Sequence, residues 1–217
     1  MNMRYVRPGR HAFGVAAAVV LLSAGLTGCG GSDAPKNTGG GDKAAAPAPS
    51  STAKTVNKPF TDKVVPTRVA VPRLKINAPV EEVGLSKDGS VETPTLDEPQ
   101  MTGWYNRGPT PGQKGPAVIL GHIDTAKTGP AVFYKLKDLK AGDKVTVTRK
   151  DGSQADFTVQ KLEDVSKEQF PSQKVYGDLT YSGLRLITCG GAFDKSKGSY
   201  EDNTIVFAKL AGTRAAT

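Results

Sequence analysis

The chain has 217 residues, of which 37% are hydrophobic, and a formal net charge of +8. This length allows one substantial domain with additional segments, and two cysteines in unlike contexts exclude a disulfide-stapled fold. Residues 63–217 carry 22 Lys and Arg against 18 Asp and Glu, so the charge on this part is small and spread out. Without a clustered basic face or a nucleic-acid motif, nucleic-acid binding is disfavoured, and a positive surface facing an anionic cell envelope is the simpler interpretation.

The N-terminus is typical of an export signal. Three arginines and no acidic residue within the first 11 residues precede an uncharged apolar run over 12–26, which is short for an unaided membrane span. The sequence Leu-Thr-Gly-Cys that ends at Cys29 resembles a bacterial lipobox. This resemblance implies a signal peptide over 1–28, lipidation of Cys29 and a tether to the extracellular face of the cytoplasmic membrane. An uncleaved signal anchor with an incidental cysteine is the alternative.

Residues 29–62 are predicted to form a flexible linker. They are rich in Gly, Ala, Pro and Ser, and up to about residue 58 they lack aromatic side chains. Such a segment cannot bury enough apolar surface to fold, and we expect it to hold the domain away from the membrane. The folded domain is expected over 63–212, followed by a short tail over 213–217.

From about residue 64, short apolar stretches alternate with Gly, Pro, Asp and Asn, which predicts many short strands and little helix. Trp104 and Tyr105 are placed before a loop rich in Gly and Pro. Short helices are expected near 131–139 and 171–176, and Asp151 with Gly152 predicts a hairpin turn. The expected strands cover 68–71, 78–84, a short segment from 91, 117–122, 144–150, 155–159, 184–189 and 204–210, with 190–202 as a loop. This pattern predicts a mainly β fold, a closed, antiparallel-rich barrel of about eight strands.

Cys189 and His122 are the candidate catalytic pair. They are the only cysteine and the only histidine after residue 30, and each stands at the end of an apolar strand. This arrangement suggests a nucleophile and a general acid or base. The alternatives are a buried cysteine that acts as a small apolar residue and a hydrogen-bonded core histidine. In an exported chain an idle reduced thiol is a liability, which favours the catalytic interpretation.

The segments 117–124 and 184–191 together resemble the two signature strands of sortases, the extracellular cysteine transpeptidases of Gram-positive bacteria. The resemblance covers roughly residues 67–210 and implies the eight-stranded sortase β-barrel. Further matches make the chain most similar to the class F sortases of actinobacteria. They lie at Gly103–Tyr105, in the glycines and prolines of 111–116, at Phe170–Pro171 and Val175–Gly177, at Phe193–Asp194, and at Tyr200–Asn203.

The resemblance also implies a mechanism. Cys189 attacks the threonine carbonyl of an LPXTG-like sorting signal and forms a thioacyl-enzyme, while His122 protonates the leaving amine. An amine nucleophile of the cell wall or of a protein, or water, then resolves the intermediate. Two alternatives remain: an enzyme that acts mainly as a hydrolase at the same site, and a non-catalytic exported binding lipoprotein on a sortase-like barrel.

The sequence leaves open which residue stabilises the oxyanion. Better-known sortases place an arginine at the start of the last strand, and here that place holds Asn203. No arginine lies between Cys189 and Arg214. Strand alternation puts residues 185, 187 and 189 on one face, so we expect Arg185 to point into the groove of Cys189 and take this role. Asn203 as a neutral donor is the alternative, with Arg185 as a surface residue.

Other polar residues near the two motifs are weaker candidates. Asp124 is expected to orient the imidazole or contact the substrate, or else to cap the following turn. Thr188 and Gly190 are candidate oxyanion or substrate contacts. Acidic pairs elsewhere are interpreted as a solvated face, and we expect no cofactor, no required metal and no nucleic-acid partner.

Overall fold

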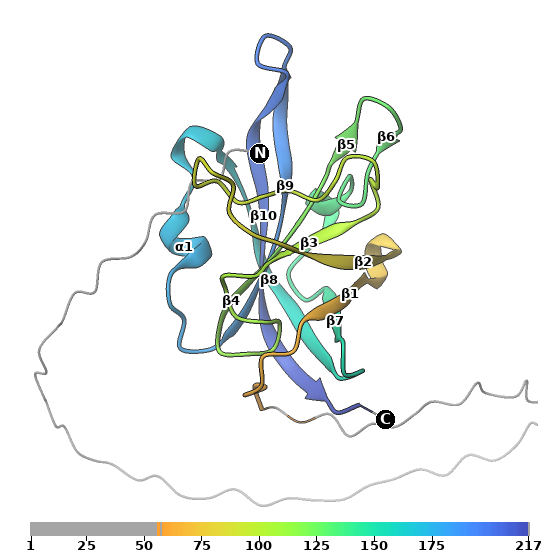
Figure 1. Cartoon of the computed structure of the whole chain (residues 1–217), viewed down its shortest axis with the longest axis vertical. Helices are drawn as coiled ribbons and strands as arrows, with labels where there is room; N and C mark the ends of the chain where they lie inside the picture. The colour runs from red at the N-terminus through yellow and green to blue at the C-terminus, as the bar shows by residue number, and fades with distance from the viewer. Residues whose placement is uncertain (1–55, 57, 217) are drawn as a thin grey trace, which may run out of the picture. The chain divides into compact units, whose positions relative to one another are not determined.

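The computed structural model describes residues 56 and 58–216. Within them, eight strands close into a barrel in the order β1-β2-β3-β4-β9-β10-β8-β7 (Figure 1). β5 (Asp124–Thr125) and β6 (Gly129–Pro130) form a separate two-stranded sheet. The barrel strands are β1 (Pro66–Val71), β2 (Ile76–Val83), β3 (Thr102–Tyr105), β4 (Gly115–Gly121), β7 (Lys144–Arg149), β8 (Gln154–Ser166), β9 (Ser182–Asp194) and β10 (Ser199–Arg214). The predicted mainly β, closed barrel is confirmed.

Most pairings in the barrel are antiparallel, but β2 pairs with β3, and β4 with β9, in parallel. β3 was not predicted: all four of its residues are buried, so it lacks the alternation of a strand with one wet face. The short strand expected from Val91 is instead an isolated bridge to Leu85. The loop expected over 190–202 is a hairpin, whose turn is held by the Asp194 carboxylate accepting from the backbone of Ser196 at 2.8 Å.

Helical structure in the described chain is limited to short segments. These are η1 (Pro72–Leu74), η2 (Leu136–Asp138), η3 (Lys167–Gln169) and α1 (Ser172–Tyr176). α1 agrees with the prediction near 171–176. The helix expected over 131–139 shrinks to η2, because the N–H groups of Tyr134, Leu136 and Leu139 donate to carbonyls three residues back, as in tight turns, and not four back as in an α-helix.

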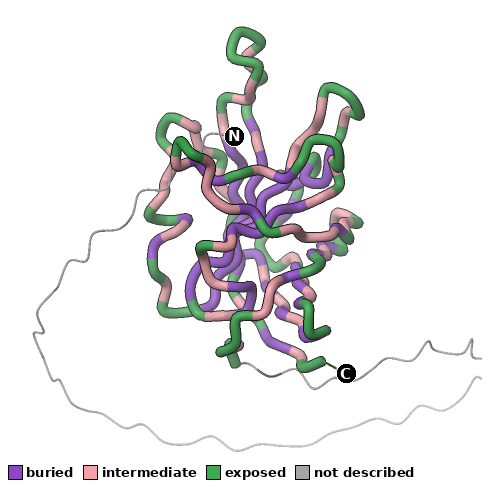
Figure 2. The backbone as a smooth tube through the Cα atoms, viewed as in Figure 1, coloured by how far each residue is buried: buried purple, intermediate pink, exposed green. Residues whose placement is uncertain are grey.

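Alternation along β9 and β10 gives these strands two buried faces. Leu184, Leu186, Val206 and Ala208 face the barrel interior. Ile187 and others on the opposite face belong to a second apolar cluster that includes Val175 of α1. Figure 2 shows this burial along the strands and the exposed tips of the hairpins. Cys189 stands two residues beyond Ile187, so it continues the outer face of the barrel wall.

The two ends of the described chain meet at the end of the barrel opposite the tip of the β9–β10 hairpin. Val56 pairs with Thr213 of β10, ten residues from Asn203 along the strand. Phe60 packs on the core, and the guanidinium of Arg149 lies 3.8 Å from its ring centroid. The linker prediction thus extends too far, because this aromatic side chain is anchored. Figure 1 shows these ends far from the tips of the β9–β10 and β5–β6 hairpins.

The expected signal peptide over 1–28, the lipidation site at Cys29 and most of the linker lie outside the described residues. Among the residues that are described, no helix has the length and apolar character needed to cross a membrane.

Candidate active site

Two parallel strands bring the imidazole and the thiol to one place. In the register of β4 and β9, Leu120 pairs with Ile187. His122 and Cys189 each follow two residues later, so both continue along the same outer face. Adjacent strands lie roughly 4.8 Å apart. The strand register therefore makes the two side chains neighbours at the same end of the barrel.

A cavity of about 590 Å³ opens over this pair. Its walls come from the β2–β3 connection (residues 84–101), from the stretch 122–126 and from the β9–β10 hairpin, and Cys189 is a half-buried free thiol among them. Leu96 and Phe193 are apolar, strongly exposed and part of this lining. Thr93, Ile123, Ser199 and Tyr200 also line the cavity. A free thiol in a mixed apolar and polar cavity of this size suits a peptide-like substrate.

One contact holds the ring of His122 and another holds its backbone. Its Nε2 lies 2.7 Å from the backbone oxygen of Pro94. The backbone carbonyl of His122 accepts from the N–H of Phe133 at 2.9 Å. Gly121, just before it, has no room for a side chain, because a Cβ there would lie 2.6 Å from the Phe133 ring. The absence of a side chain at 121 thus allows the close packing that sets the histidine in place.

The phenol of Tyr200 donates a hydrogen bond to the carboxylate of Asp124. This hydrogen bond joins β5 to β10. This hydrogen bond is the main reason that the pKa of Tyr200 is raised to about 12. The Tyr200 ring also packs edge-on against Phe193, with ring centroids 5.1 Å apart. In the described chain no hydrogen bond joins Asp124 to His122, so the ring is oriented by Pro94 and not by this carboxylate.

Asn203 lies directly across from Cys189 in the β9–β10 ladder. Residues paired in this way point to the same face, with Cβ atoms roughly 4.5–5.5 Å apart. The side chain is fully buried, and neither Nδ2 nor Oδ1 has a hydrogen-bond partner among the described residues. An unsatisfied buried polar group costs about 1–3 kcal/mol. The fold therefore holds a polar amide with unmade hydrogen bonds beside the thiol.

Arg185 does not line the cavity, contrary to expectation. It shares the outer face with Cys189, but Ile187 stands between them, and four residues of strand span roughly 13 Å. Its guanidinium is buried and donates to the backbone oxygen of Lys174 in α1 at 3.4 Å. Burial lowers the pKa of the guanidinium. The long side chain turns under α1 because a buried charge needs the carbonyl acceptors found there.

Thr188 and Gly190 do not share the face of Cys189. Thr188 pairs with Thr204, and both point to the barrel interior beyond Leu186. A Cβ at Gly190 would lie 2.7 Å from the Thr204 hydroxyl oxygen, so only glycine fits there without a shift. These two residues shape the strand around the cysteine, and neither of them lines the cavity.

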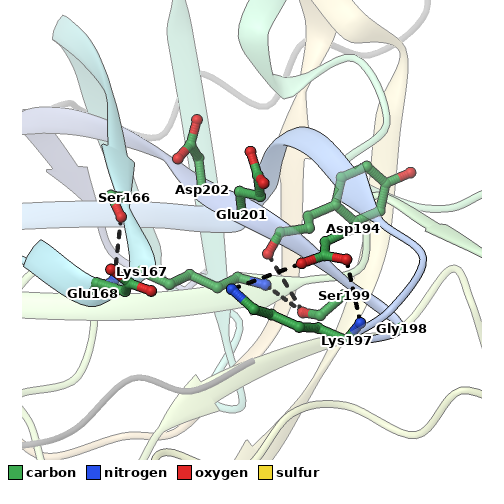
Figure 3. Close-up of a pocket in the computed structure, with 10 residues that line it drawn as sticks. Ser166, Lys167, Glu168, Asp194, Lys197, Gly198, Ser199, Glu201 and Asp202 are labelled. Atoms are coloured by element: carbon green, nitrogen blue, oxygen red, sulfur yellow. Dashed lines mark hydrogen bonds and ion pairs between the residues drawn. The ribbon is translucent and has the colours of Figure 1, made fainter.

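A larger polar hollow of about 940 Å³ lies beside the cavity and shares residues 198–200 with it. Figure 3 shows that both of its lysines have partners: Lys167 donates to the Ser199 hydroxyl at 2.8 Å, and Lys197 lies 3.7 Å from the Asp194 carboxylate. It contains no cysteine or histidine. The chemistry therefore belongs to the smaller cavity. In the described part of the chain, no group of three or more His, Cys, Asp or Glu side chains is arranged to hold a metal ion.

Sequence reasoning missed two groups at the site. The Pro94 carbonyl is a backbone atom 28 residues from His122 and leaves no signal in the sequence. Tyr200 and Phe193 were noted only as parts of matching motifs, although both line the cavity. An exposed aromatic residue close to the cysteine in sequence was the available signal.

A β-barrel that holds a cysteine beside a histidine over a cavity of this kind has the makeup of an enzyme with a cysteine nucleophile. The family model of the sortase domain matches residues 69–211. The chain therefore belongs to the sortase family, whose members are cysteine transpeptidases that act on sorting-signal substrates and amine nucleophiles.

Solved structures share the fold. Sortase A of Listeria monocytogenes is 20% identical, with a TM-score of 0.53, over 72% of this chain and 92% of that one. The SrtA sortase of Actinomyces oris is 23% identical, with a TM-score of 0.53, over 76% of this chain and 89% of that one. No curated protein matches the chain.

Proposed function

We propose that this sortase is a membrane-tethered enzyme of the class F type. It cleaves LPXTG-like sorting signals after threonine and transfers the acyl group to an amine at the cell surface. The observation that carries this proposal is the shared cavity of His122 and Cys189, each two residues beyond the last pair of the parallel strands β4 and β9. The class rests on motif resemblance along the chain, and the tether rests on the export signal and the lipobox-like sequence at Cys29.

The reaction uses one thiol and one imidazole. Cys189 Sγ attacks the threonine carbonyl carbon, and the thiol proton passes to His122. Collapse of the tetrahedral intermediate breaks the C–N bond, and His122 gives its proton to the leaving amine. An acceptor amine then attacks the thioester and passes a proton to His122. That proton returns to the sulfur when the C–S bond breaks.

We assign stabilisation of the oxyanion to Asn203. Its amide is buried across from Cys189, and the Nδ2 hydrogens have no acceptor among the described residues. A substrate oxygen that gains negative charge beside the thiol would supply this acceptor. Arg185 donates to the backbone oxygens of Leu184 in β9 and Lys174 in α1, so we assign it a structural role.

The proposed tether would reach the barrel at the end opposite the cavity, where Val56 pairs with Thr213. The catalytic cavity would then face away from the point of attachment, toward substrates in the envelope. Mass analysis of the mature N-terminal peptide tests this part. We expect a diacylglycerol group on Cys29 that is absent from Cys29→Ser, and an unmodified, uncleaved N-terminus would instead support a signal anchor.

The enzymatic proposal is tested with the purified chain, an LPXTG-type peptide library and several candidate amines. We expect cleavage after threonine and a new amide to the acceptor, with both lost in Cys189→Ala and His122→Ala. Free acid as the main product at saturating amine would favour the hydrolase. The absence of cleavage would leave an unusual sorting motif or the binding lipoprotein.

A thiol-reactive probe separates those last two outcomes. An activated Cys189 labels rapidly near neutral pH and slows in His122→Ala. Comparable labelling rates in the parent and this variant would contradict the activation of Cys189 by His122 and favour an idle cysteine. Cys29→Ser in both proteins leaves Cys189 as the one thiol that is followed.

A further inference from the structure

We infer that His122 exchanges protons through Nδ1, because the backbone carbonyl of Pro94 keeps Nε2 as a donor. The inference rests on the proposed function and names the atom that performs its proton transfers. Nε2 lies 2.7 Å from the Pro94 oxygen. A carbonyl oxygen only accepts hydrogen bonds, so Nε2 carries a hydrogen whenever this contact is made.

The state of Nδ1 follows from the state of Nε2. A neutral imidazole has a single N–H, so a hydrogen on Nε2 leaves the lone pair on Nδ1. No group in the described chain forms a hydrogen bond with Nδ1. The ring lines the same cavity as Cys189. Nδ1 is therefore the atom that takes the thiol proton and later donates it to the leaving amine.

The carbonyl is anchored on both sides of Pro94. On one side, Glu92 donates its N–H to the Gly84 oxygen at 3.0 Å and accepts from Gly84 N–H through its carboxylate at 2.8 Å. On the other side, Thr95 donates its N–H to the Glu81 carboxylate at 3.4 Å. The β2–β3 connection thus presents the Pro94 oxygen as a fixed part of the site.

A backbone carbonyl is a different partner from a carboxylate. A carboxylate beside the ring would hold a charged imidazolium in a strong, charge-assisted hydrogen bond. The neutral Pro94 oxygen orients the ring in both protonation states and adds no charge that opposes release of the proton. Pro94 is therefore a positioning residue that acts through its main chain.

Nitrogen NMR of the ring tests the inference directly. The full chain with His11→Asn and ¹⁵N-labelled histidine leaves His122 as the one labelled ring. In a long-range ¹H–¹⁵N spectrum at a pH where the ring is neutral, we expect a protonated Nε2 and an unprotonated Nδ1. A protonated Nδ1, or averaging between the two tautomers, would overturn the inference. This spectrum needs no turnover, so failure of peptide cleavage would count against the proposed function alone.

A backbone change tests the role of the carbonyl. Replacing Thr95 with its α-hydroxy analogue turns the peptide bond after Pro94 into an ester, whose oxygen is a weaker acceptor. We expect mixed tautomers and a fall in kcat of roughly tenfold, part of the 10²–10⁴ that acid–base catalysis contributes, with KM little changed. Glu81→Ala is the matched control, because the ester also removes the Thr95 N–H. An unchanged tautomer ratio in the ester protein would contradict the assignment to Pro94.

Discussion

The outer face of β9 and β10 carries two buried polar side chains whose surroundings differ. At one end Arg185 donates to two backbone carbonyls, with Nε left unpartnered in the described chain, and the Phe207 ring centroid lies 4.7 Å from its guanidinium carbon. At the other end Asn203 lies opposite Cys189 with both amide atoms unpartnered in the described chain. Buried polar groups are normally hydrogen-bonded within the fold. The difference favours a structural role for the arginine and supports our proposal that the asparagine amide acts on the substrate.

The largest expected effect is the loss of catalysis when the unpartnered amide is removed. Asn203→Ala should lower kcat by roughly 10²–10³, the cost of one oxyanion donor. Alkylation of Cys189 by iodoacetamide forms no oxyanion, so its rate should stay near that of the parent. Peptide cleavage and alkylation kinetics on the same preparations measure the two effects.

Asn203→Asp is the matched control, because it keeps the shape and removes the donor. It should lose at least as much activity as the alanine variant. Near-normal cleavage by a folded Asn203→Ala protein, with loss of cleavage in Arg185→Ala, would restore the role that strand alternation suggested for the arginine.

The second effect is on stability, at the other end of the face. Arg185→Ala should lower the free energy of unfolding by about 2–4 kcal/mol, because it leaves a cavity and removes the hydrogen bond that joins β9 to α1. Cleavage by the folded protein should stay close to that of the parent. Urea unfolding measures the first quantity, and unchanged stability with lost cleavage would contradict the structural role.

The third effect has the opposite sign. Asn203→Leu replaces an unsatisfied amide with an apolar side chain of similar size, so it should raise the free energy of unfolding by about 1–3 kcal/mol while abolishing turnover. Each kcal/mol corresponds to a rise in Tm of about 2–4 °C for a chain of this length. Ile205→Val, on the same face, provides a comparison that should slightly lower Tm. A destabilised leucine variant would mean that the amide has partners.

The smallest effect concerns the rim of the cavity. The Asp124 hydrogen bond raises the pKa of Tyr200 from 10.0 to about 12. A raised pKa contributes stability that is complete below pH 10 and is lost as the pH rises toward 12. The difference in unfolding free energy between the parent and Tyr200→Phe should therefore shrink across that range. A difference independent of pH, or one unchanged in an Asp124→Asn background, would contradict the assignment.

The sequence revealed the strands of His122 and Cys189 because each contains an apolar run followed by glycine, although β9 continues past its glycines to Asp194. The same reasoning missed β3, whose four buried residues show no alternation. It also overextended the helix near 131–139, where backbone groups bond to distant carbonyls. Local patterns therefore predicted strands with a strong periodic signal and failed where tertiary contacts decide.

The site residues also divide into those that a local sequence pattern predicts and those that depend on tertiary contacts. His122 and Cys189 stand out because each is the only residue of its type after residue 30. Alternation placed Arg185 on the correct face, but it does not give the direction of a long side chain. The missing partners of Asn203 and the contact of Pro94 with His122 depend on register and loop position. Neither is visible in a local motif.

Intact-protein mass spectrometry is the most direct test of acyl transfer at Cys189. The chain is mixed with an LPXTG-type peptide in the absence of an amine and is quenched early. We expect an added mass equal to the acyl part of the peptide up to threonine, located on Cys189, absent from Cys189→Ala and discharged when an amine is added. Cleavage without this adduct, or an adduct on any other residue, would contradict the mechanism.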